Sequence, residues 1–530
     1  MLKLVSPIEM KQLDEAAIEK ARVPGLILME NAAMAITSKI MAHIQAEELA
    51  APRVLILSGT GNNGGDGFAV ARQLALEHIH PQVVLLGQEK KLKGDALVNW
   101  EILQHRDDID TLVINPKSST CEEELSYLSA YIREADIIVD ALLGTGITGA
   151  PKSPMDRVIQ DVNQERNPLS WVISVDIPSG VAGATGNVET DAVQADMTVS
   201  MALPKTGLVF YPGAEYAGQL SCVPIGIPGH LMKDHIQTHH YLVTHESAAN
   251  LIPQRRPHVH KGHLGKILAI AGSRHMMGAG ALTAGGALKT GSGLVTLAVP
   301  DSESGTAQAK VSAGVMTAEL PSHAGYLGAD APREALEIIG RTDAAAVGPG
   351  LGRGAPVFRM VEQLLAESQV PLVLDADALN VLEGKAEILA SARSPVIITP
   401  HVGEFARLTG ESIQRIKERL IDTVKSYASK WRVTIVLKGA PSLIASPDGY
   451  VFVNRSGNAG MATGGSGDVL TGMVVSLVGQ GLDHETAAVV GVYLHGLAGD
   501  LAAQNLGQES MTAPDIIEYI SEAYRELSKY

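Results

Sequence analysis

The sequence predicts an α/β protein of two domains, each built on a largely parallel β-sheet that is covered by helices. Short apolar segments alternate with longer segments of helical periodicity over most of the 530 residues. Aromatic residues make up only 4% of the chain, so its cores must consist of Ala, Val, Ile and Leu, the usual filling of parallel sheets. A chain of this length is too long for one ordinary domain, which has about 100–200 residues.

Ten apolar segments are predicted as buried strands. In the first half they are Val54–Leu57, Val83–Leu86, Ile137–Val139 and Trp171–Val175. In the second half they are Ile267–Ile270, Leu294–Val299, Ala344–Val347, Pro371–Leu374, Val396–Thr399 and Thr434–Leu437. Because helical segments separate them, we expect parallel pairing with crossover helices on both faces of each sheet.

The composition changes near residues 228–260, where the chain is polar, rich in His and weakly periodic. We interpret this stretch as a linker or domain edge and divide the chain into residues 1–232 and 233–530. Four histidines of this stretch (His235, His239, His240, His245) are of the residue type that binds metal ions, but no Cys or carboxylate pattern accompanies them. A solvated connector is therefore the favoured interpretation.

Charge and cysteine content exclude several classes of function. The formal net charge of −16 disfavours a nucleic-acid partner, since phosphate backbones are bound by basic patches. Two cysteines, Cys121 and Cys222, form neither a disulfide framework nor a metal cluster, which fits a reducing cytoplasm. The N-terminal residues lack the apolar run of a signal peptide, and we expect no membrane-spanning segment.

A glycine-rich segment follows the first predicted strand. Residues Val54–Gly67 read VLILSGTGNNGGDG, and we expect a strand, a glycine loop and a helix that begins near Phe68. Backbone N–H groups at such a helix start bind anions. Asn62, Asn63 and Asp66 add polar side chains to this loop, which favours a ligand site over a purely structural turn.

Two further predicted strands in the first half end in an acid. Asp140 is followed by a Gly-Thr-Gly loop, and Asp176 by the turn Pro178-Ser179-Gly180. Ligands of open α/β sheets lie at the carboxyl ends of the strands. Each Asp taken singly is also compatible with a helix cap. Taken together, Asn63, Asp140, Asp176 and Ser179 indicate a site at one edge of the sheet.

These segments, together with MENAA at Met29–Ala33 and ALPKTGL at Ala202–Leu208, resemble the NAD(P)H-hydrate epimerase domain. The resemblance covers about residues 8–228 and implies a Rossmann-like doubly wound fold that exchanges the R and S hydrates at nicotinamide C6. It implies a potassium ion held by Asn63, Asp140 and Ser179, with Asp176 as acid/base group. The implied substrate contacts are Asn62, Asn63, Gly64, Gly65, Asp66, Gly144, Thr145, Gly146, Ile147, Thr148, Gly149, Ala150 and Asp176.

The second half contains the stretch NAGMATGGSGDVLTG at Asn458–Gly472. Residues Gly464–Gly467 lead into Asp468 and a helical segment, so N–H groups at the helix start would form an anion hole for a transferred phosphoryl group. Asp468 stands beside this hole, where it would take a proton from a hydroxyl group. A second motif, IVLKGAPSLIA, ends a strand at Lys438 and exposes Lys438–Ser442 to an adenine nucleotide.

The motifs GPGLG (Gly348–Gly352), DADALN (Asp375–Asn380) and TPHVGE (Thr399–Glu404) also follow predicted strands. The set resembles the ribokinase-like NAD(P)H-hydrate dehydratase from about His260 to Tyr530. The resemblance implies phosphorylation of the 6-hydroxyl of the S hydrate, preferably by ADP and with Mg²⁺, followed by loss of phosphate. It implies hydrate contacts by Ala279, Gly350, Gly352, His401 and Asp468. The implied nucleotide contacts are Lys438, Gly439, Ala440, Pro441, Ser442 and Gly467.

Two other functions remain as alternatives. A kinase for a vitamin-like alcohol with an N-terminal regulatory module would use the same second-half fold, although the three strand-end motifs argue against it. A non-catalytic scaffold of RNA–protein assemblies would be expected to lose its acids, whereas Asp140 and Asp176 are present. The expected partners are the small molecules NADHX, NADPHX and ADP, without nucleic acid or membrane, in a homo-oligomer.

Overall fold

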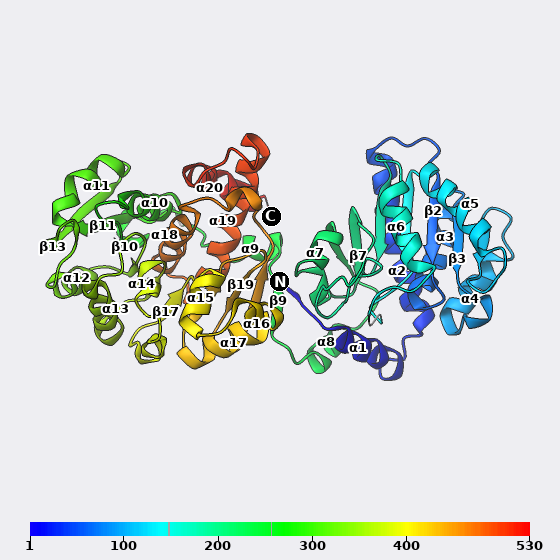
Figure 1. Ribbon diagram of the computed structural model, residues 1–530, viewed down its shortest axis with the longest axis horizontal. Helices are drawn as coiled ribbons and strands as arrows, with labels where there is room; N and C mark the ends of the chain where they lie inside the picture. Colours follow the sequence, from blue (N-terminus) through cyan, green and yellow to red (C-terminus); the bar gives the residue numbers. More distant parts are fainter. Residues whose placement is uncertain (147–148, 256, 530) are drawn as a thin grey trace. The chain divides into compact units, whose positions relative to one another are not determined.

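The structure is a computed structural model that describes residues 1–530 apart from Ile147, Thr148, Arg256 and Tyr530. The chain divides into two compact units, Leu2–Thr238 and His239–Tyr530, the second joined by Met1. The division falls inside the His-rich stretch. Each unit is an α/β structure with a mainly parallel sheet, which confirms the predicted fold class (Figure 1).

The first unit has a seven-stranded sheet in the order β4-β3-β2-β5-β6-β7-β8, in which all neighbouring strands are parallel. The strands are β2 (Val54–Ser58), β3 (Gln82–Leu86), β4 (Asp110–Ile114), β5 (Ile137–Ala141), β6 (Trp171–Val175), β7 (Met197–Met201) and β8 (Gln219–Val223). The strand order reverses between β2 and β5, and this switch point is where open α/β sheets bind ligands.

Helices cover both faces of this sheet because successive strand residues point to opposite sides. Val54 and Ile56 of β2 pack with α1 (Pro7–Glu19), α2 (Gly25–Ala46), α3 (Asn62–Leu76) and α4 (Gly94–Leu103). Leu55 and Leu57 pack on the other side with α5 (Cys121–Glu134) and α6 (Met155–Glu165). Two short helices, α7 (Gly213–Tyr216) and α8 (Gly229–His235), follow the later strands. The unit is therefore doubly wound.

The second unit has a sheet in the order β9-β20-β19-β18-β17-β16-β15-β10-β11-β12, parallel from β12 to β18. Strands β18, β19 and β20 form an antiparallel meander at one side. The strands are β9 (His240–Leu242), β10 (Lys266–Ile270), β11 (Leu294–Pro300), β12 (Val315–Leu320), β15 (Ala344–Val347), β16 (Leu372–Leu374), β17 (Val396–Ile398), β18 (Thr434–Leu437), β19 (Ser442–Ala445) and β20 (Val451–Asn454). A hairpin of β13 (Ser322–His323) and β14 (Tyr326–Leu327) lies outside this sheet.

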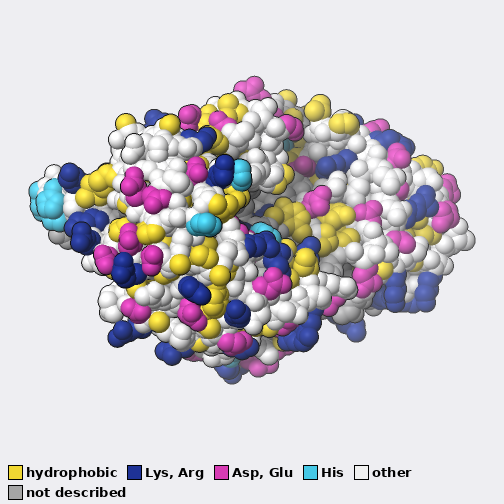
Figure 2. Space-filling view, turned by 60° about the vertical axis from the view of Figure 1, so that its left-hand side comes forward, with side chains coloured by type: hydrophobic (Ala, Val, Ile, Leu, Met, Phe, Trp, Pro, Cys, Tyr) yellow, Lys and Arg dark blue, Asp and Glu magenta, His cyan; other side chains and the backbone are white. Residues whose placement is uncertain are grey.

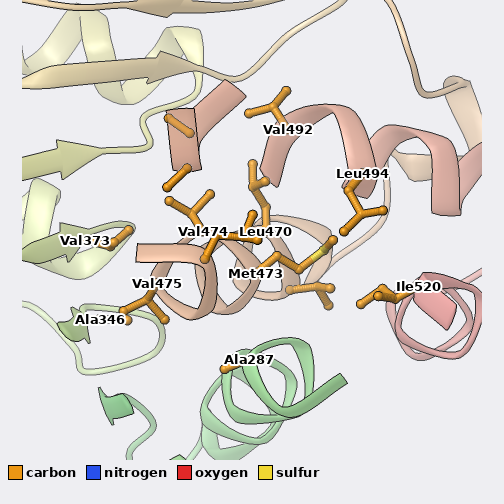
Figure 3. Packing of buried hydrophobic residues seen from close by; sticks show 14 of the residues in the cluster. Ala287, Ala346, Val373, Leu470, Met473, Val474, Val475, Val492, Leu494 and Ile520 are labelled. Atoms are coloured by element: carbon orange, nitrogen blue, oxygen red, sulfur yellow. The ribbon is translucent and has the colours of Figure 1, made fainter. Parts of the chain in front are cut away.

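One face of the second sheet is covered by four helices: α10 (Met277–Lys289), α18 (Ser466–Gly479), α19 (His484–Leu506) and α20 (Ala513–Leu527). Figure 3 shows α18 at the centre, with Val475 towards Ala346 and Val373 of the sheet and Met473 among the helices. Helices α12 (Ala331–Ile339), α13 (Ala355–Glu367) and α17 (Leu420–Trp431) lie on the other side. The remaining helices are α9 (His245–Ala249), α11 (Ser304–Lys310), α14 (Asp377–Asn380), α15 (Val402–Thr409) and α16 (Ile413–Glu418).

Among the described residues, one helix is long and apolar enough to cross a membrane, α19 (His484–Leu506). It is mostly buried within its own unit, as the central helix of a folded core is. On the face shown in Figure 2, basic side chains are interspersed with acidic ones. Cys121 and Cys222 are free thiols.

Candidate active sites

The glycine-rich segment after β2 differs from its predicted form. The expectation of a loop followed by a helix near Phe68 is wrong, because α3 begins at Asn62. A β-carbon on Gly64 would lie 1.9 Å from the Gly59 carbonyl oxygen, and one on Gly67 would lie 2.5 Å from Ser58 Oγ. The glycines therefore let α3 pack closely on β2. Asn62 and Asn63 still lie in the first turn of α3. Backbone N–H groups in the first turn of a helix can bind phosphate.

The ends of β2, β5 and β6 bring three predicted residues together. Asp140 is fully buried at the end of β5 and accepts hydrogen bonds from the backbone N–H of Ser179 (2.8 Å), from its hydroxyl, and from Ser174 Oγ (2.8 Å). Asn63 Nδ2 donates to the Leu143 carbonyl (3.2 Å), which lies 3.3 Å from Ser179 Oγ. Burial raises the pKa of Asp140 more than the bonds from Ser179 and Ser174 lower it.

This group presents only oxygen ligands: an amide, a carboxylate, a hydroxyl and the Leu143 carbonyl. It carries one formal negative charge, and its carboxylate is shielded from water. Hard cations are bound by oxygen ligands, and one negative charge in a buried site suits a monovalent ion. The Leu143 carbonyl was not predicted, since a backbone atom leaves no mark on the sequence.

Asp176 lies next to a buried lysine. Its backbone has a φ of +64°, an uncommon conformation for a residue other than Gly or Asn. Its Oδ1 accepts a hydrogen bond from the N–H of Met201 (2.9 Å) and a short one from Lys205 Nζ. Lys205 is fully buried, and its ammonium also donates to the Met201 carbonyl (3.0 Å) and to Ser200 Oγ (3.3 Å). The lysine thus fixes one oxygen of Asp176 and leaves the other for a ligand.

Two more carboxyl groups share this lysine. Burial raises the pKa of Asp14, on α1, to about 6, with the charge of Asp176 adding to the shift and Lys205 opposing it. Burial also raises the pKa of Asp66, on α3, well above its ordinary value, and Asp176 and Asp14 contribute. The end of β6 therefore brings two carboxyl groups of raised pKa, Asp14 and Asp66, close to the Asp176–Lys205 pair, an arrangement that suits proton transfer.

The remaining predicted residues of this site belong to the segment that follows β5. Gly144 packs against Asn63, where an added β-carbon would be 3.2 Å from Asn63 Cβ. Thr145 lies beside Gly183, where an added β-carbon would be 3.5 Å from Thr145 Cγ2. Space is open around Gly146, and Gly149 has Glu189 nearby, followed by Ala150. Ile147 and Thr148 lie outside the described residues. Lys205 and Asp14 were missed, although Lys205 lies in the quoted motif ALPKTGL.

In the second unit the start of α18 has the backbone arrangement that the predicted anion hole requires. The helix begins at Ser466, after Gly465 with a φ of +94°, so Gly467 and Asp468 lie in its first turn. His495 of α19 supports this turn: its Nε2 lies 3.0 Å from the Ser466 carbonyl. Burial lowers the pKa of His495 to about 4, so the ring is neutral and donates from Nε2. The contact supports the first turn of α18, where the N–H groups of a helix have no acceptor within the helix itself and can bind an anion.

A buried ion pair stands against this helix start. Asp375, which follows β16, is 1% exposed and accepts from Lys438 Nζ (2.7 Å) and from Thr471 Oγ1 (2.7 Å). A β-carbon on Gly467 would lie 3.1 Å from Lys438 Nζ, so the ammonium touches the first turn of α18. Burial works to lower the pKa of Lys438, but Asp375 and Glu404 outweigh it and raise the pKa.

Asp468 is held near its neutral form. Burial raises the pKa of its carboxyl to about 7, the charge of Asp375 adds to the shift, and Lys438 opposes it. Asp377 and Glu404 raise it further. A carboxyl group that titrates near neutral pH accepts and returns protons with little cost, which suits a general base.

The other predicted hydrate contacts surround this point. Gly350, with a φ of +67°, packs on Ala279, since an added β-carbon would lie 3.1 Å from Ala279 Cβ. The N–H of Gly352 donates to Asp377 Oδ2 (2.8 Å). His401 Nδ1 accepts from the N–H groups of Gly403 (3.0 Å) and Glu404 (3.3 Å), which leaves the ring proton on Nε2, 3.6 Å from Glu404 Oε2.

The predicted nucleotide segment Lys438–Ser442 forms the turn between β18 and β19. Ser442 Oγ donates to the Gly439 carbonyl (2.9 Å); Gly439 and Ala440 are exposed at the tip of the turn, whereas Pro441 is buried. No role was predicted for Asp375 and Thr471, although they lie in the motifs DADALN and NAGMATGGSGDVLTG. His495 was also missed. Among the described residues, no three His, Cys, Asp or Glu side chains are grouped to hold a metal ion, the His-rich stretch included.

Comparisons with known proteins match both units. Residues 25–207 match the family model "YjeF-related protein N-terminus", and residues 267–522 match "NAD(P)H-hydrate dehydratase". Over 530 residues the chain is 41% identical to a bifunctional NAD(P)H-hydrate repair enzyme of Moorella thermoacetica, with 99% of this chain and 97% of the relative covered. It is 38% identical to the enzyme of the same name from Thermofilum pendens over 526 residues, with 99% and 97% covered.

One solved structure resembles the second unit in sequence. It is an ADP/ATP-dependent NAD(P)H-hydrate dehydratase from Bacillus subtilis, co-crystallised with ATP and Mg²⁺. It is 28% identical, with a TM-score of 0.48, and covers 54% of this chain and 98% of its own.

Proposed function

We propose, because this chain belongs to the family of bifunctional NAD(P)H-hydrate repair enzymes, that its first unit epimerises NADHX and NADPHX and its second unit dehydrates the S forms with ADP. The observation that carries the chemistry is Asp468 with a pKa of about 7 beside Lys438 at the start of α18. Epimerisation supplies the second unit with the epimer that it accepts. Cytoplasmic location and a homo-oligomeric state belong to the same proposal.

Dehydration follows from the geometry of the second site. Asp468 takes the proton of the 6-hydroxyl while the hydroxyl oxygen attacks the terminal phosphorus of ADP and AMP leaves. Lys438 and the N–H groups of α18 stabilise the charge on the transferred phosphoryl group. The ring nitrogen then expels phosphate from C6, and loss of a proton from C5 gives the reduced nicotinamide. AMP, phosphate and NAD(P)H are the products.

Mg²⁺ fits this site for reasons of charge. The phosphates of ADP carry about three negative charges, whereas Lys438 and a helix start provide about one and a half positive charges. We assign no residue of this chain as a ligand of the ion. It would bind together with ADP, on the phosphate oxygens, and neutralise part of their charge. The segment Lys438–Ser442 of this ribokinase-like unit would contact the nucleotide. The hydrate would be contacted by Ala279, Gly350, Gly352 and His401.

Epimerisation is assigned to the carboxyl groups around Lys205. The ring nitrogen weakens the C6–O bond, so a group that protonates the departing hydroxyl and later deprotonates the returning water inverts C6 without net change. Asp176 is the proposed acid/base group, with Asn62–Asp66 and Gly144–Ala150 as dinucleotide contacts. This role is supported by the hydrogen bonds from Lys205 and Met201, which hold Oδ1 and leave Oδ2 to exchange the proton.

The assignment is tested with a mixture of R and S NADH hydrates. The full chain is incubated with ADP or with ATP, and the return of the reduced-nicotinamide absorbance is followed. Complete recovery of both epimers with ADP is expected, and faster than with ATP. Recovery of only one epimer would contradict the epimerase assignment. No recovery with either nucleotide would favour the kinase alternative.

The dehydration rate should follow the ionisation of Asp468. Because the raised pKa lies at about 7 and the base must be ionised, the rate falls as the pH drops below 7, approaching tenfold per unit. The measurement is the kcat of ADP-dependent recovery of pure S hydrate between pH 5 and 9, corrected for the spontaneous reaction. A rate that stays constant down to pH 5.5 would contradict Asp468 as the base.

Potassium is proposed at Asn63, Asp140 and Ser179, where the oxygen ligands described above fit it. When bound, the ion would provide a fixed positive charge at the strand ends. We expect KCl to raise the unfolding midpoint of the first unit by about 2–4 °C relative to tetramethylammonium chloride, as ligand linkage predicts for about 1 kcal/mol. Ser179→Ala should reduce this difference, and an equal shift in the variant would count against the site.

A further inference from the structure

Asp375 lies where a free carboxylate would hinder phosphoryl transfer. Its Oδ2 is 3.8 Å from the position of a β-carbon on Gly467, at the helix start that is proposed to bind phosphate. Asp375 is 1% exposed, so water does not shield its charge. A buried negative charge at this place repels a phosphate group unless a cation compensates for it.

The compensation comes from two elements that are distant in the sequence. Lys438, after β18, binds Oδ1, and Thr471, on the second turn of α18, binds Oδ2, each at 2.7 Å. The same lysine ammonium lies 3.1 Å from a β-carbon position on Gly467. Asp375 thereby ties a flexible lysine side chain to the buried face of α18 and holds its charge at the first turn.

We infer that Asp375 is a positioning residue of the dehydration site, which holds the Lys438 ammonium at the point where the phosphoryl group is transferred. This inference rests on the proposed function of the second unit. Asp375 itself does not contact the phosphate, because both of its oxygens are occupied by Lys438 and Thr471. It acts through the lysine and through its effect on Asp468.

The charges that face Asp468 make the role measurable. They are Asp375 after β16, Asp377 on α14, Glu404 on α15 and Lys438 after β18, while His495 on α19 is neutral. Removing the charge of Asp375 lowers the pKa of Asp468, since the raising effect of a neighbouring anion is lost. The acid limb of the pH profile then moves to lower pH, which a purely structural residue would not cause.

The test compares Asp375→Asn with the unaltered full chain, using S hydrate and ADP. We expect kcat to fall about 10- to 100-fold at pH 8, as when a preorganised charge at the transition state is lost. The KM for the hydrate should stay within about threefold, and the acid limb should move below pH 7. In the Lys438→Met background the same change should cost little more kcat at pH 8, where Asp468 is mostly ionised in either case and the positioning role needs the ammonium.

Several outcomes would overturn the inference. A kcat within twofold of the unaltered chain, an unmoved acid limb, or a full additional loss in the Lys438→Met background each contradicts it. If Asp375→Asn does not fold, Thr471→Val provides the test, because it keeps the charges of both Asp375 and Lys438. We expect kcat to fall about fivefold and the acid limb of the pH profile to stay in place. An unchanged kcat would refute the positioning role. Inactivity of the unaltered chain would instead refute the proposed function.

Discussion

Replacement of Asp468 by Asn should reduce ADP-dependent dehydration by about 10²- to 10⁴-fold and leave epimerisation unchanged. A general base contributes a factor of this size, and the asparagine keeps the shape of the side chain while it removes the proton acceptor. Asp468 lies in the first turn of α18, and its replacement by an Asn of nearly equal size creates no large cavity, so the fold should persist. The measurement is kcat for pure S hydrate, with epimer exchange followed separately in the same sample.

A matched control is available on the same sheet. Asp448 is exposed in the turn after β19, which runs antiparallel to β18 and so carries the chain away from Lys438 to the opposite edge. Asp448→Asn changes the net charge equally and should leave kcat unchanged. Dehydration that survives in Asp468→Asn, or that falls equally in Asp448→Asn, would remove the assigned role of Asp468.

Most strands that are buried on both faces could be predicted from sequence, although β7, β19 and β20 are largely buried and were not predicted. All ten predicted segments overlap observed strands, because continuous Val, Ile, Leu and Ala runs are typical of buried parallel strands. Eight lie wholly within them, while Pro371 and Thr399 fall just outside β16 and β17. Strand β4 was not predicted, since it lies at the sheet edge with Asp110 and Thr111 exposed. The short strand β9 was missed in the same way, within a stretch interpreted as a linker.

Only those site residues that directly follow a strand could be predicted from sequence. The rule that ligands lie at the carboxyl ends of parallel strands brought Asn63, Asp140 and Ser179 to one place, and the structure has them in contact through Leu143. Partners that meet only through the tertiary fold were missed. Lys438 and Asp375 are 63 residues apart in the chain. The glycines at the start of α3 were predicted to form a loop, whereas they lie in a helix. Glycine serves both purposes, because it allows a loop to bend and also allows a helix to pack closely on a strand.

Replacement of Asp176 by Asn should abolish enzymatic exchange of the R and S hydrates, a loss of about 10²- to 10⁴-fold, while S hydrate is still dehydrated. Asn is the better test than Ala, because the φ of +64° is tolerated by Asn and strains Ala. An amide oxygen also still accepts the bonds from Met201 and Lys205, so the buried ammonium keeps a partner. Asp176→Ala should show the same loss with lower stability.

The decisive measurement is the consumption of R hydrate in the presence of ADP. In the unaltered chain R hydrate disappears because exchange feeds the S-specific site, whereas in Asp176→Asn it should persist and decay only at the spontaneous rate. Asp110→Asn is the matched control, since Asp110 is exposed at the start of β4, at the edge of the sheet opposite the site. Undiminished consumption of R hydrate by Asp176→Asn would show that another group, with Asp14 and Asp66 the nearest carboxyls, carries the proton.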